Sequence, residues 1–174
     1  ISGEPEFFFI NENIFDNFKD GALIKSEAKN SLDELPFPSW GEIIPNLKAS
    51  TLFGNEKTLP IIATRGCPYS CFKYCVYPLQ QGRTVRHRSP KNIVDELVHW
   101  KNKLNVNSFI FRDPVFSINR KFTEKLCKRI IERKTKVLFT KMMSWSTSFP
   151  KNKTAHAWRN YELEKKAGRA HAKL

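Results

Sequence analysis

The sequence contains no long hydrophobic run, no stretch that reads as a signal peptide and no initiator Met. None of its apolar stretches approaches the roughly 18 to 20 residues that cross a bilayer, so no membrane partner is expected. Residues 1–6 are acidic, whereas a secretory signal has basic residues followed by an apolar stretch. We therefore expect a cytoplasmic protein, and the missing Met predicts that the chain is a fragment of a longer one.

Cysteine is scarce, with four in a chain of 174 residues, and three of them lie close together at Cys67, Cys71 and Cys75. This clustering favours a reduced compartment and a metal site over disulfides. A structural zinc site takes four ligands, and the next His after the cluster, His87, is twelve residues further on. Three thiolates in a loop after a strand instead predict three ligands of a 4Fe–4S cluster, whose fourth iron can bind a small molecule. Cys127 stands alone in a helical pattern and is interpreted as a core residue.

Acidic residues are rare in the later part of the chain. Residues 1–60 contain 5 Lys/Arg and 10 Asp/Glu, whereas residues 61–174 contain 25 and 7, which gives net charges of −5 and +18. A basic face of this kind is typical either of a solvated surface or of a protein that binds an anionic ligand or nucleic acid. The same two interpretations stay open for Arg83, Arg86 and Arg88, which can meet a carboxylate or phosphate or can be solvated.

A regular pattern of strands and helices begins near residue 58. The apolar run 59–64 predicts a buried strand, and 108–113 and 136–139 predict two more. Ser89 before Pro90 is typical of a helix start, and the helix that follows has an apolar face formed by Ile93, Leu97, Trp100 and Leu104. A second helix is expected over 119–134, with four buried residues: Phe122, Leu126, Ile130 and Ile131.

The alternation of strands and helices with short loops predicts an α/β fold with right-handed parallel units. An open sheet and a barrel both fit this order. A complete eight-stranded barrel needs at least about 200 residues, so the stretch 58–139 holds at most about two and a half β/α units. Residues 1–57 are expected to be the end of an upstream domain and a linker, and residues 140–174 a basic tail without a clear fold.

The stretch Arg65–Pro78, RGCPYSCFKYCVYP, resembles the signature loop of the radical S-adenosylmethionine enzymes. The likeness continues in Gln81–Arg83, Arg86, Arg88–Leu97 and Phe111–Ser117. Leu32–Pro38 resembles the linker before the barrel in the cobalamin-binding branch of that superfamily, and Gly3–Glu6 resembles the end of the cobalamin domain. The resemblance covers roughly residues 1–139 and implies a partial parallel (β/α) barrel.

The resemblance implies that Cys67, Cys71 and Cys75 hold a 4Fe–4S cluster and that S-adenosylmethionine, bound to the open iron, is cleaved to a 5′-deoxyadenosyl radical. It implies an adenine contact for Tyr74, which can otherwise pack within the loop. It implies a contact with the methionine moiety for Asp113, which can otherwise cap the turn at Pro114. A reductant such as flavodoxin or ferredoxin would be a partner, the substrate stays unknown, and an upstream domain absent from this chain would hold cobalamin.

Two features depart from the family pattern. The family spacing is CxxxCxxC, whereas this chain has CxxxCxxxC, with Phe72 or Lys73 as the additional residue. Three ligands must converge on one cluster, so either the additional residue bulges out of the loop or the third thiolate is misplaced. After Phe139 the strand and helix pattern ends, and a barrel that stopped there would expose a sheet edge, which predicts poor stability of the isolated chain.

By resemblance, the reaction is methyl transfer or a radical rearrangement or cyclisation associated with cobalamin. A nearer alternative is a transfer-RNA methylthiotransferase, which Gly82–Arg83 and the basic balance suit, although that family has three more cysteines upstream and residues 1–66 contain none. A non-catalytic module that binds zinc or nucleic acid is an alternative from another class, and the missing fourth ligand disfavours the zinc site.

Overall fold

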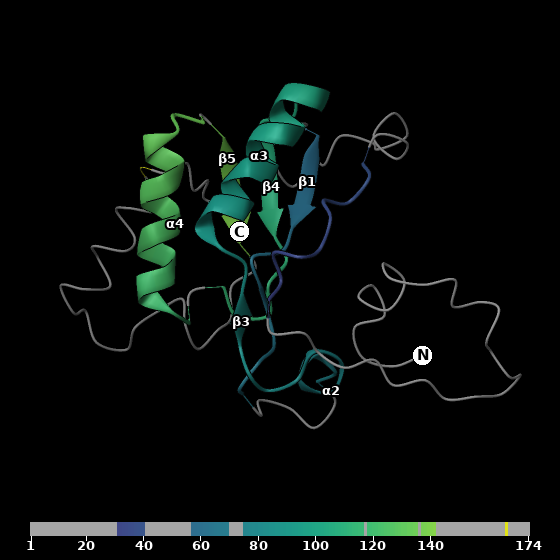
Figure 1. Ribbon diagram of the computed structural model, residues 1–174. Coiled ribbons are helices and arrows are strands. Elements are labelled where there is room, and N and C mark those ends of the chain that lie inside the picture. Colours follow the sequence, from purple (N-terminus) through teal and green to yellow (C-terminus); the bar gives the residue numbers. More distant parts are fainter. Residues whose placement is uncertain are drawn as a thin grey trace, which may run out of the picture.

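The structure, a computed structural model, describes residues 31–40, 57–69, 75–116, 118–135 and 137–141, together with Lys166. The predictions for residues 1–30, Cys71, Tyr74 and almost all of the basic tail therefore lie outside the described residues. The described part alternates strands and helices along the chain, as Figure 1 shows. Within it, no helix is both long enough and apolar enough to cross a bilayer.

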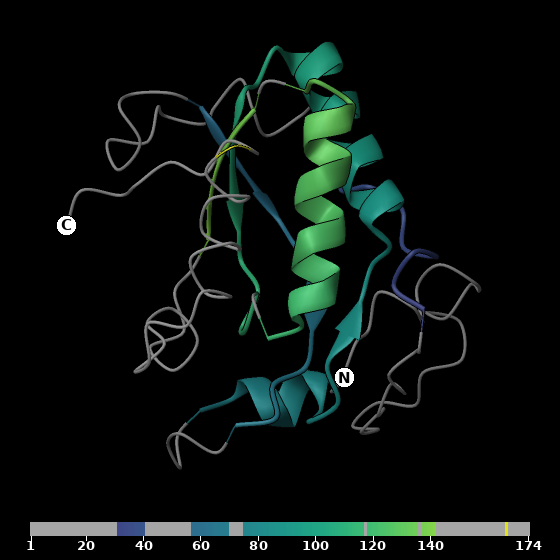
Figure 2. The same ribbon diagram turned by 90° about the vertical axis from the view of Figure 1, so that its left-hand side faces the viewer.

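Three parallel strands form the main sheet. β1 (Thr58–Ile61) pairs with β4 (Ser108–Phe111), and β4 pairs with β5 (Leu138–Lys141), so the spatial order follows the chain order. Both connecting helices lie on one face of this sheet and contact each other (Figure 2). A parallel sheet with both crossover helices on one face is singly wound, as in the wall of a barrel. The parallel strands and connecting helices confirm the predicted α/β fold.

Both helices begin at a side-chain cap, and the cap of the first is the predicted Ser89. α3 (Pro90–Leu104) starts after Ser89, whose Oγ accepts a hydrogen bond from Asn92 N at 3.1 Å. α4 (Arg120–Glu132) starts after Asn119, whose Oδ1 accepts from Phe122 N at 3.1 Å. Capping satisfies amide groups that have no partner inside the helix.

The apolar faces of these helices cover the sheet. The predicted residues Ile93, Leu97, Trp100, Phe122, Leu126 and Ile130 are buried. They pack against side chains of the strands, chiefly Leu59, Ile61, Phe109, Phe111 and Phe139. Cys127 is also in this core, as predicted. Ile131 was expected to be buried and is 38% exposed, because it lies one position away from the stripe that faces the sheet.

The first predicted strand, 59–64, is wrong as a single element. β1 ends at Ile61, the chain turns at Ile62 and Ala63, and β2 (Thr64–Arg65) pairs antiparallel with β3 (Arg86–His87). A short helix, α2 (Tyr77–Gln81), lies between β2 and β3. The apolar run is continuous through the turn, so the sequence pattern gave no sign of the break.

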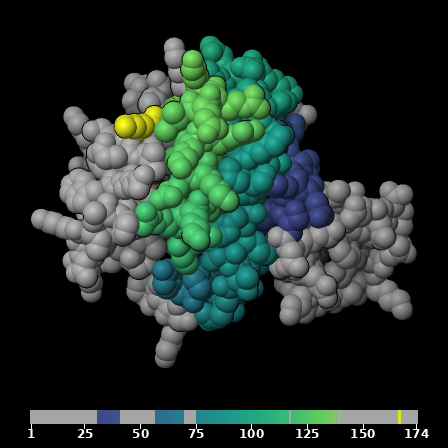
Figure 3. All heavy atoms as spheres, turned by 60° about the vertical axis from the view of Figure 1, so that its left-hand side comes forward, coloured from purple at the N-terminus to yellow at the C-terminus, as the bar shows by residue number. Residues whose placement is uncertain are grey.

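Residues 31–40, here called the strap, contain no helix or strand, as expected for a proline-rich linker. They nevertheless pack closely against α3, as the adjoining surfaces in Figure 3 show. Leu32 is buried, Asp33 Oδ1 accepts from Ser89 N at 2.7 Å, and the Phe37 ring lies 5.8 Å from the His99 ring. The strap therefore belongs to the structure of the sheet and helix layer.

Candidate functional site

The cysteine loop leaves the sheet through a small hairpin. Beyond the carboxyl end of β1, the β2–β3 pair brings residues 66 and 85 to the base of one loop, below the sheet in Figure 1. Gln81, the last residue of α2, fastens this base: its Oε1 accepts from Gly66 N at 3.1 Å, and its carbonyl accepts from Arg86 Nη2 at 2.9 Å. Cys67 N also donates to Gly82 O at 3.1 Å. Parallel sheets bind ligands at this edge, so the loop has the position expected of a site.

Gly66 is required by this geometry. Its φ is +94°, and a Cβ there would lie 2.1 Å from the carbonyl oxygen of Thr84. Residues with a side chain rarely adopt this φ, and a Cβ cannot fit so close to a carbonyl oxygen. The residue before the first cysteine thus lets the two chains of the hairpin approach closely.

Two of the three predicted metal ligands lie among the described residues. Cys67 is buried and Cys75 is half-buried, and both are free thiols. The third predicted ligand, Cys71, lies outside the described residues, as does the additional residue of the spacing. Within the described residues alone, no three His, Cys, Asp or Glu side chains gather as a metal site.

Asp113 lies two residues after the end of β4 and holds the turn that follows β1. Its Oδ1 accepts from Ala63 N at 2.9 Å, from Thr64 Oγ1 at 2.8 Å and from Thr64 N. These bonds cross to the neighbouring strand, whereas the sequence had offered the Pro114 turn as the target. Its Oδ2 is buried and has no hydrogen-bond partner among the residues that the structure describes. Burial raises the pKa of Asp113 to about 6, against the opposing effect of the bonds from Thr64 and Ala63.

Arg88, one of the three arginines considered for an anion, meets a carboxylate of its own chain. Its Nη1 lies 2.5 Å from Glu96 Oε2, and both side chains are buried. Arg86 likewise donates to Gln81 O of the hairpin. Glu96 was not predicted from the sequence, although a signal was present: it lies three positions after Ile93 and four before Trp100, on the apolar face of the helix. A charged residue on such a face indicates a buried ion pair.

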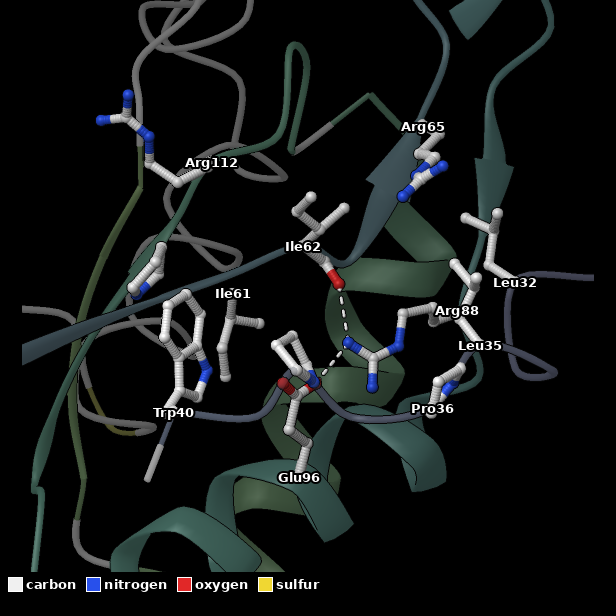
Figure 4. Close-up of a pocket in the computed structure, with 12 residues that line it drawn as sticks. Leu32, Leu35, Pro36, Trp40, Ile61, Ile62, Arg65, Arg88, Glu96 and Arg112 are labelled. Carbon is white, nitrogen blue, oxygen red and sulfur yellow. Dashed lines mark hydrogen bonds and ion pairs between the residues drawn. The ribbon is translucent and has the colours of Figure 1, made fainter. Parts of the chain in front are cut away.

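A cavity of about 660 Å³ lies between the strap, the end of β1 and α3 (Figure 4). Its walls are mostly apolar and include Leu32, Trp40, Ile61 and Ile62, with the Arg88–Glu96 pair on one side. Arg65 and Arg112 also line it, but Figure 4 shows the Arg112 guanidinium directed away from the other labelled side chains. The cavity thus borders the turn that leads to the cysteine loop.

Comparisons with known proteins bear on the class to which this chain is related. No protein-family model matches the chain. The chain is 33% identical over 120 residues to an anaerobic magnesium-protoporphyrin IX monomethyl ester cyclase of Cereibacter sphaeroides, covering 67% of this chain and 19% of the cyclase. It is 27% identical over 121 residues to an uncharacterized methyltransferase of Pyrococcus horikoshii, covering 66% and 25%.

Solved structures of TsrM, a radical S-adenosylmethionine methyltransferase of Kitasatospora setae, share the fold. One, with tryptophan and a SAM analogue bound, has a TM-score of 0.52 at 18% identity and covers 64% of this chain and 20% of TsrM. Another, with cobalamin and a 4Fe–4S cluster bound, has a TM-score of 0.53 at 18% identity and covers 66% and 21%. Together the matches relate this chain to the radical S-adenosylmethionine enzymes, as the sequence resemblance predicted. The chain spans about a quarter or less of the relatives it matches.

Proposed function

We propose that the chain forms the first part of the catalytic domain of a radical S-adenosylmethionine enzyme, with residues 58–139 as part of the barrel. The observation that carries the proposal is the position of Cys67 and Cys75, two free thiols in a loop that leaves the carboxyl edge of a parallel sheet through a fastened hairpin. This arrangement holds thiols where parallel sheets bind ligands. Residues 1–57 would then be the end of an upstream domain and its connection.

Cys67, Cys71 and Cys75 would hold the 4Fe–4S cluster. When bound, such a cluster with S-adenosylmethionine on its open iron supplies a one-electron reductive cleavage of the sulfonium. The protein's part is to keep the thiols reduced and close together and to limit water. The burial of Cys67 limits its contact with water, and the close hairpin around Gly66 fixes the point where the cysteine loop begins.

Asp113 fits the polar end of S-adenosylmethionine. Its Oδ1 is fully used by the turn, while its buried Oδ2 has no partner among the described residues. A buried carboxylate oxygen without a donor is costly, and an amino N–H is a donor that compensates it. We infer that Oδ2 accepts from the amino group of the methionine moiety, and that Tyr74 packs near the adenine.

The relatives favour methyl transfer or a radical cyclisation as the reaction, because one is named a methyltransferase and another a cyclase. A TsrM structure holds cobalamin. For this protein, cobalamin would be bound by an upstream domain, and flavodoxin or ferredoxin would supply the electron. The chain covers a quarter or less of these relatives, so their names do not identify its substrate.

Anaerobic reconstitution of the chain with iron and sulfide tests the proposal. We expect about four irons per chain and an EPR spectrum, after reduction, that changes on adding S-adenosylmethionine. Cys71→Ala should lose the cluster, whereas Cys127→Ala should keep it because Cys127 is a core residue. Zinc binding without iron uptake, or equal iron in Cys71→Ala and the unaltered chain, would contradict the proposal.

A further inference from the structure

The turn Ile62–Thr64 decides how the chain passes from β1 into the cysteine loop. Four of its main-chain groups are bonded by residues from elsewhere in the fold. The Asp113 carboxylate accepts hydrogen bonds from the amides of Ala63 and Thr64. Arg88 donates to the carbonyls of Ile62 and Ala63, through Nη1 and through its own amide, each at 2.9 Å. The turn is therefore held from two opposite sides.

Arg88 in turn is fixed to α3. Its Nε donates to Asn92 Oδ1 at 2.7 Å, and Nη1 is shared between Glu96 Oε2 and Ile62 O, as the dashed lines to Glu96 and Ile62 in Figure 4 show. The guanidinium has a planar, fixed set of donors, so three acceptors at these positions determine its orientation. Because α3 is packed into the core through Ile93 and Leu97, the turn is tied to a rigid element.

The direction of the Ile62 carbonyl explains why a donor is needed there. Ile61 O accepts from Arg112 N at 2.9 Å and so points towards β4. Successive residues of a strand point their main-chain groups to opposite sides, so the carbonyl of Ile62, directly after β1, points away from β4. Pro60, whose main chain faces the same side, has no amide to donate. Arg88 therefore supplies the donor for the Ile62 carbonyl at the point where the chain turns.

We propose that Arg88 and Glu96 are positioning residues for the cysteine loop: they fix the Ile62–Thr64 turn and thereby the place and burial of the Cys67 thiol. Glu96 orients the guanidinium, the guanidinium holds the turn, and only two residues separate Thr64 from Cys67. The role as positioning residues of a cluster ligand rests on the proposed function, whereas the effect on the thiol can be measured without a cluster.

The first experiment measures alkylation of each cysteine in the reduced, metal-free chain by iodoacetamide and mass spectrometry. In Arg88→Lys and Glu96→Gln we expect Cys67 to react about tenfold faster, the change that a loss of about 1.4 kcal/mol in local stability gives. Cys127, in the core, should keep its rate. Asp95→Asn is the matched control, since Asp95 is on the same helix and its ion pairs, with Lys91 at 2.7 Å and Arg133 at 3.3 Å, are exposed.

A second variant separates positioning from general stability. A buried ion pair replaced by apolar residues of similar size often leaves a protein equally stable. The double variant Arg88→Met with Glu96→Leu should therefore unfold near the midpoint of the unaltered chain, yet still expose Cys67, because Ile62 O has lost its donor. Equal acceleration of Cys67 and Cys127 in every variant, or no acceleration of Cys67 in a folded variant, overturns the proposal.

The reconstituted chain supplies the remaining readout. If the unaltered chain assembles a cluster, Arg88→Lys should retain iron less well or show altered g-values, and Asp95→Asn should show neither change. If the unaltered chain takes up no iron while the alkylation pattern appears as expected, the proposed function fails and the assignment of Arg88 and Glu96 to the Cys67 turn stands. The two failures are thereby distinguished.

Discussion

The helix-covered face of the sheet and its carboxyl edge are held by different means. On the covered face, both helices and all three strands contribute to one cluster of buried apolar side chains, and loop residues such as Ala63 and Phe116 complete it. At the edge, the turn Ile62–Thr64 is held by directed bonds from Asp113 and Arg88. Apolar burial is non-directional and shared among many residues, whereas each polar bond depends on one partner in one place.

This difference separates stability from site geometry. A change on the covered face should lower the free energy of unfolding of the whole layer. A change at the edge should alter where the cysteine loop lies while most of the layer stays folded. Variants of the two regions can therefore be distinguished by comparing global unfolding with the local reactivity of Cys67.

The largest effect is expected for Phe109→Ala. Phe109 is fully buried at the centre of the sheet, where it lies opposite Leu59 and Phe139 in register. Removing a buried phenyl ring costs about 3–5 kcal/mol, which is a large share of the stability of a small domain. Urea unfolding followed by circular dichroism measures it. Ile131→Ala, at a 38% exposed position of α4, should cost less than about 1 kcal/mol; similar losses in both variants would contradict this account of the core.

Gly66→Ala should have the next largest effect and act at the edge. The Cβ would meet Thr84 O at 2.1 Å in a residue with φ of +94°, so the hairpin must open. We expect a loss of about 2–3 kcal/mol and faster alkylation of Cys67. Gly82→Ala is the control: its φ is +78°, but nothing lies within 4 Å of its Cβ position. Its ψ of 175° puts it in a region that is nearly limited to glycine, so we expect a loss of about 1–3 kcal/mol from backbone strain alone. Equal acceleration of Cys67 alkylation in both variants would refute the argument from close approach.

The sequence predicted the covered face well because its signals are periodic and local. The i, i+3 and i, i+4 spacing of Ile93, Leu97 and Trp100 identifies a buried helix face, and Ser89 marks its start. Ile131 was wrongly expected to be buried, because the exposure of a residue at the border of such a stripe depends on a small rotation of the helix about its axis.

The structure at the carboxyl edge of the sheet was predicted only in part, since it depends on residues far apart in the chain. The Asp113 carboxylate meets amides 49 and 50 positions away, and no local pattern shows that bond. The break between β1 and β2 was missed for that reason. The loop of Cys67 and Cys75 was placed correctly, because a strand followed by cysteines puts the loop at the carboxyl edge.

The pH dependence of stability offers a finer test of the edge. Burial raises the pKa of Asp113 from 3.8 to about 6, so the folded state binds more protons and the protein gains stability as the pH falls from about 7 to 4. Burial lowers the pKa of His87 from 6.5, so acidification below that value has the opposite effect.

Asp113→Asn should remove the stability that Asp113 contributes at low pH and leave the stability that is lost through His87. Stability relative to the unaltered chain should then fall by up to about 3 kcal/mol between pH 7 and pH 4. Urea midpoints of both chains at several pH values measure this difference, in which titrations common to both chains cancel. If the urea midpoints of the two chains changed in parallel with pH, the raised pKa of Asp113 and the burial that causes it would be contradicted.

The smallest effect is expected for Ser89→Ala, which joins the two regions. Loss of the cap to Asn92 N should cost about 1 kcal/mol and loosen the first turn of α3, where Asn92 also accepts from Arg88. Asn119→Ala removes the equivalent cap of α4, whose residues are not among those that hold the turn. Equal losses of stability are expected in urea, but only Ser89→Ala should speed the alkylation of Cys67. If both variants left that rate unchanged, the start of α3 would not restrain the turn, and Glu96 alone would orient Arg88.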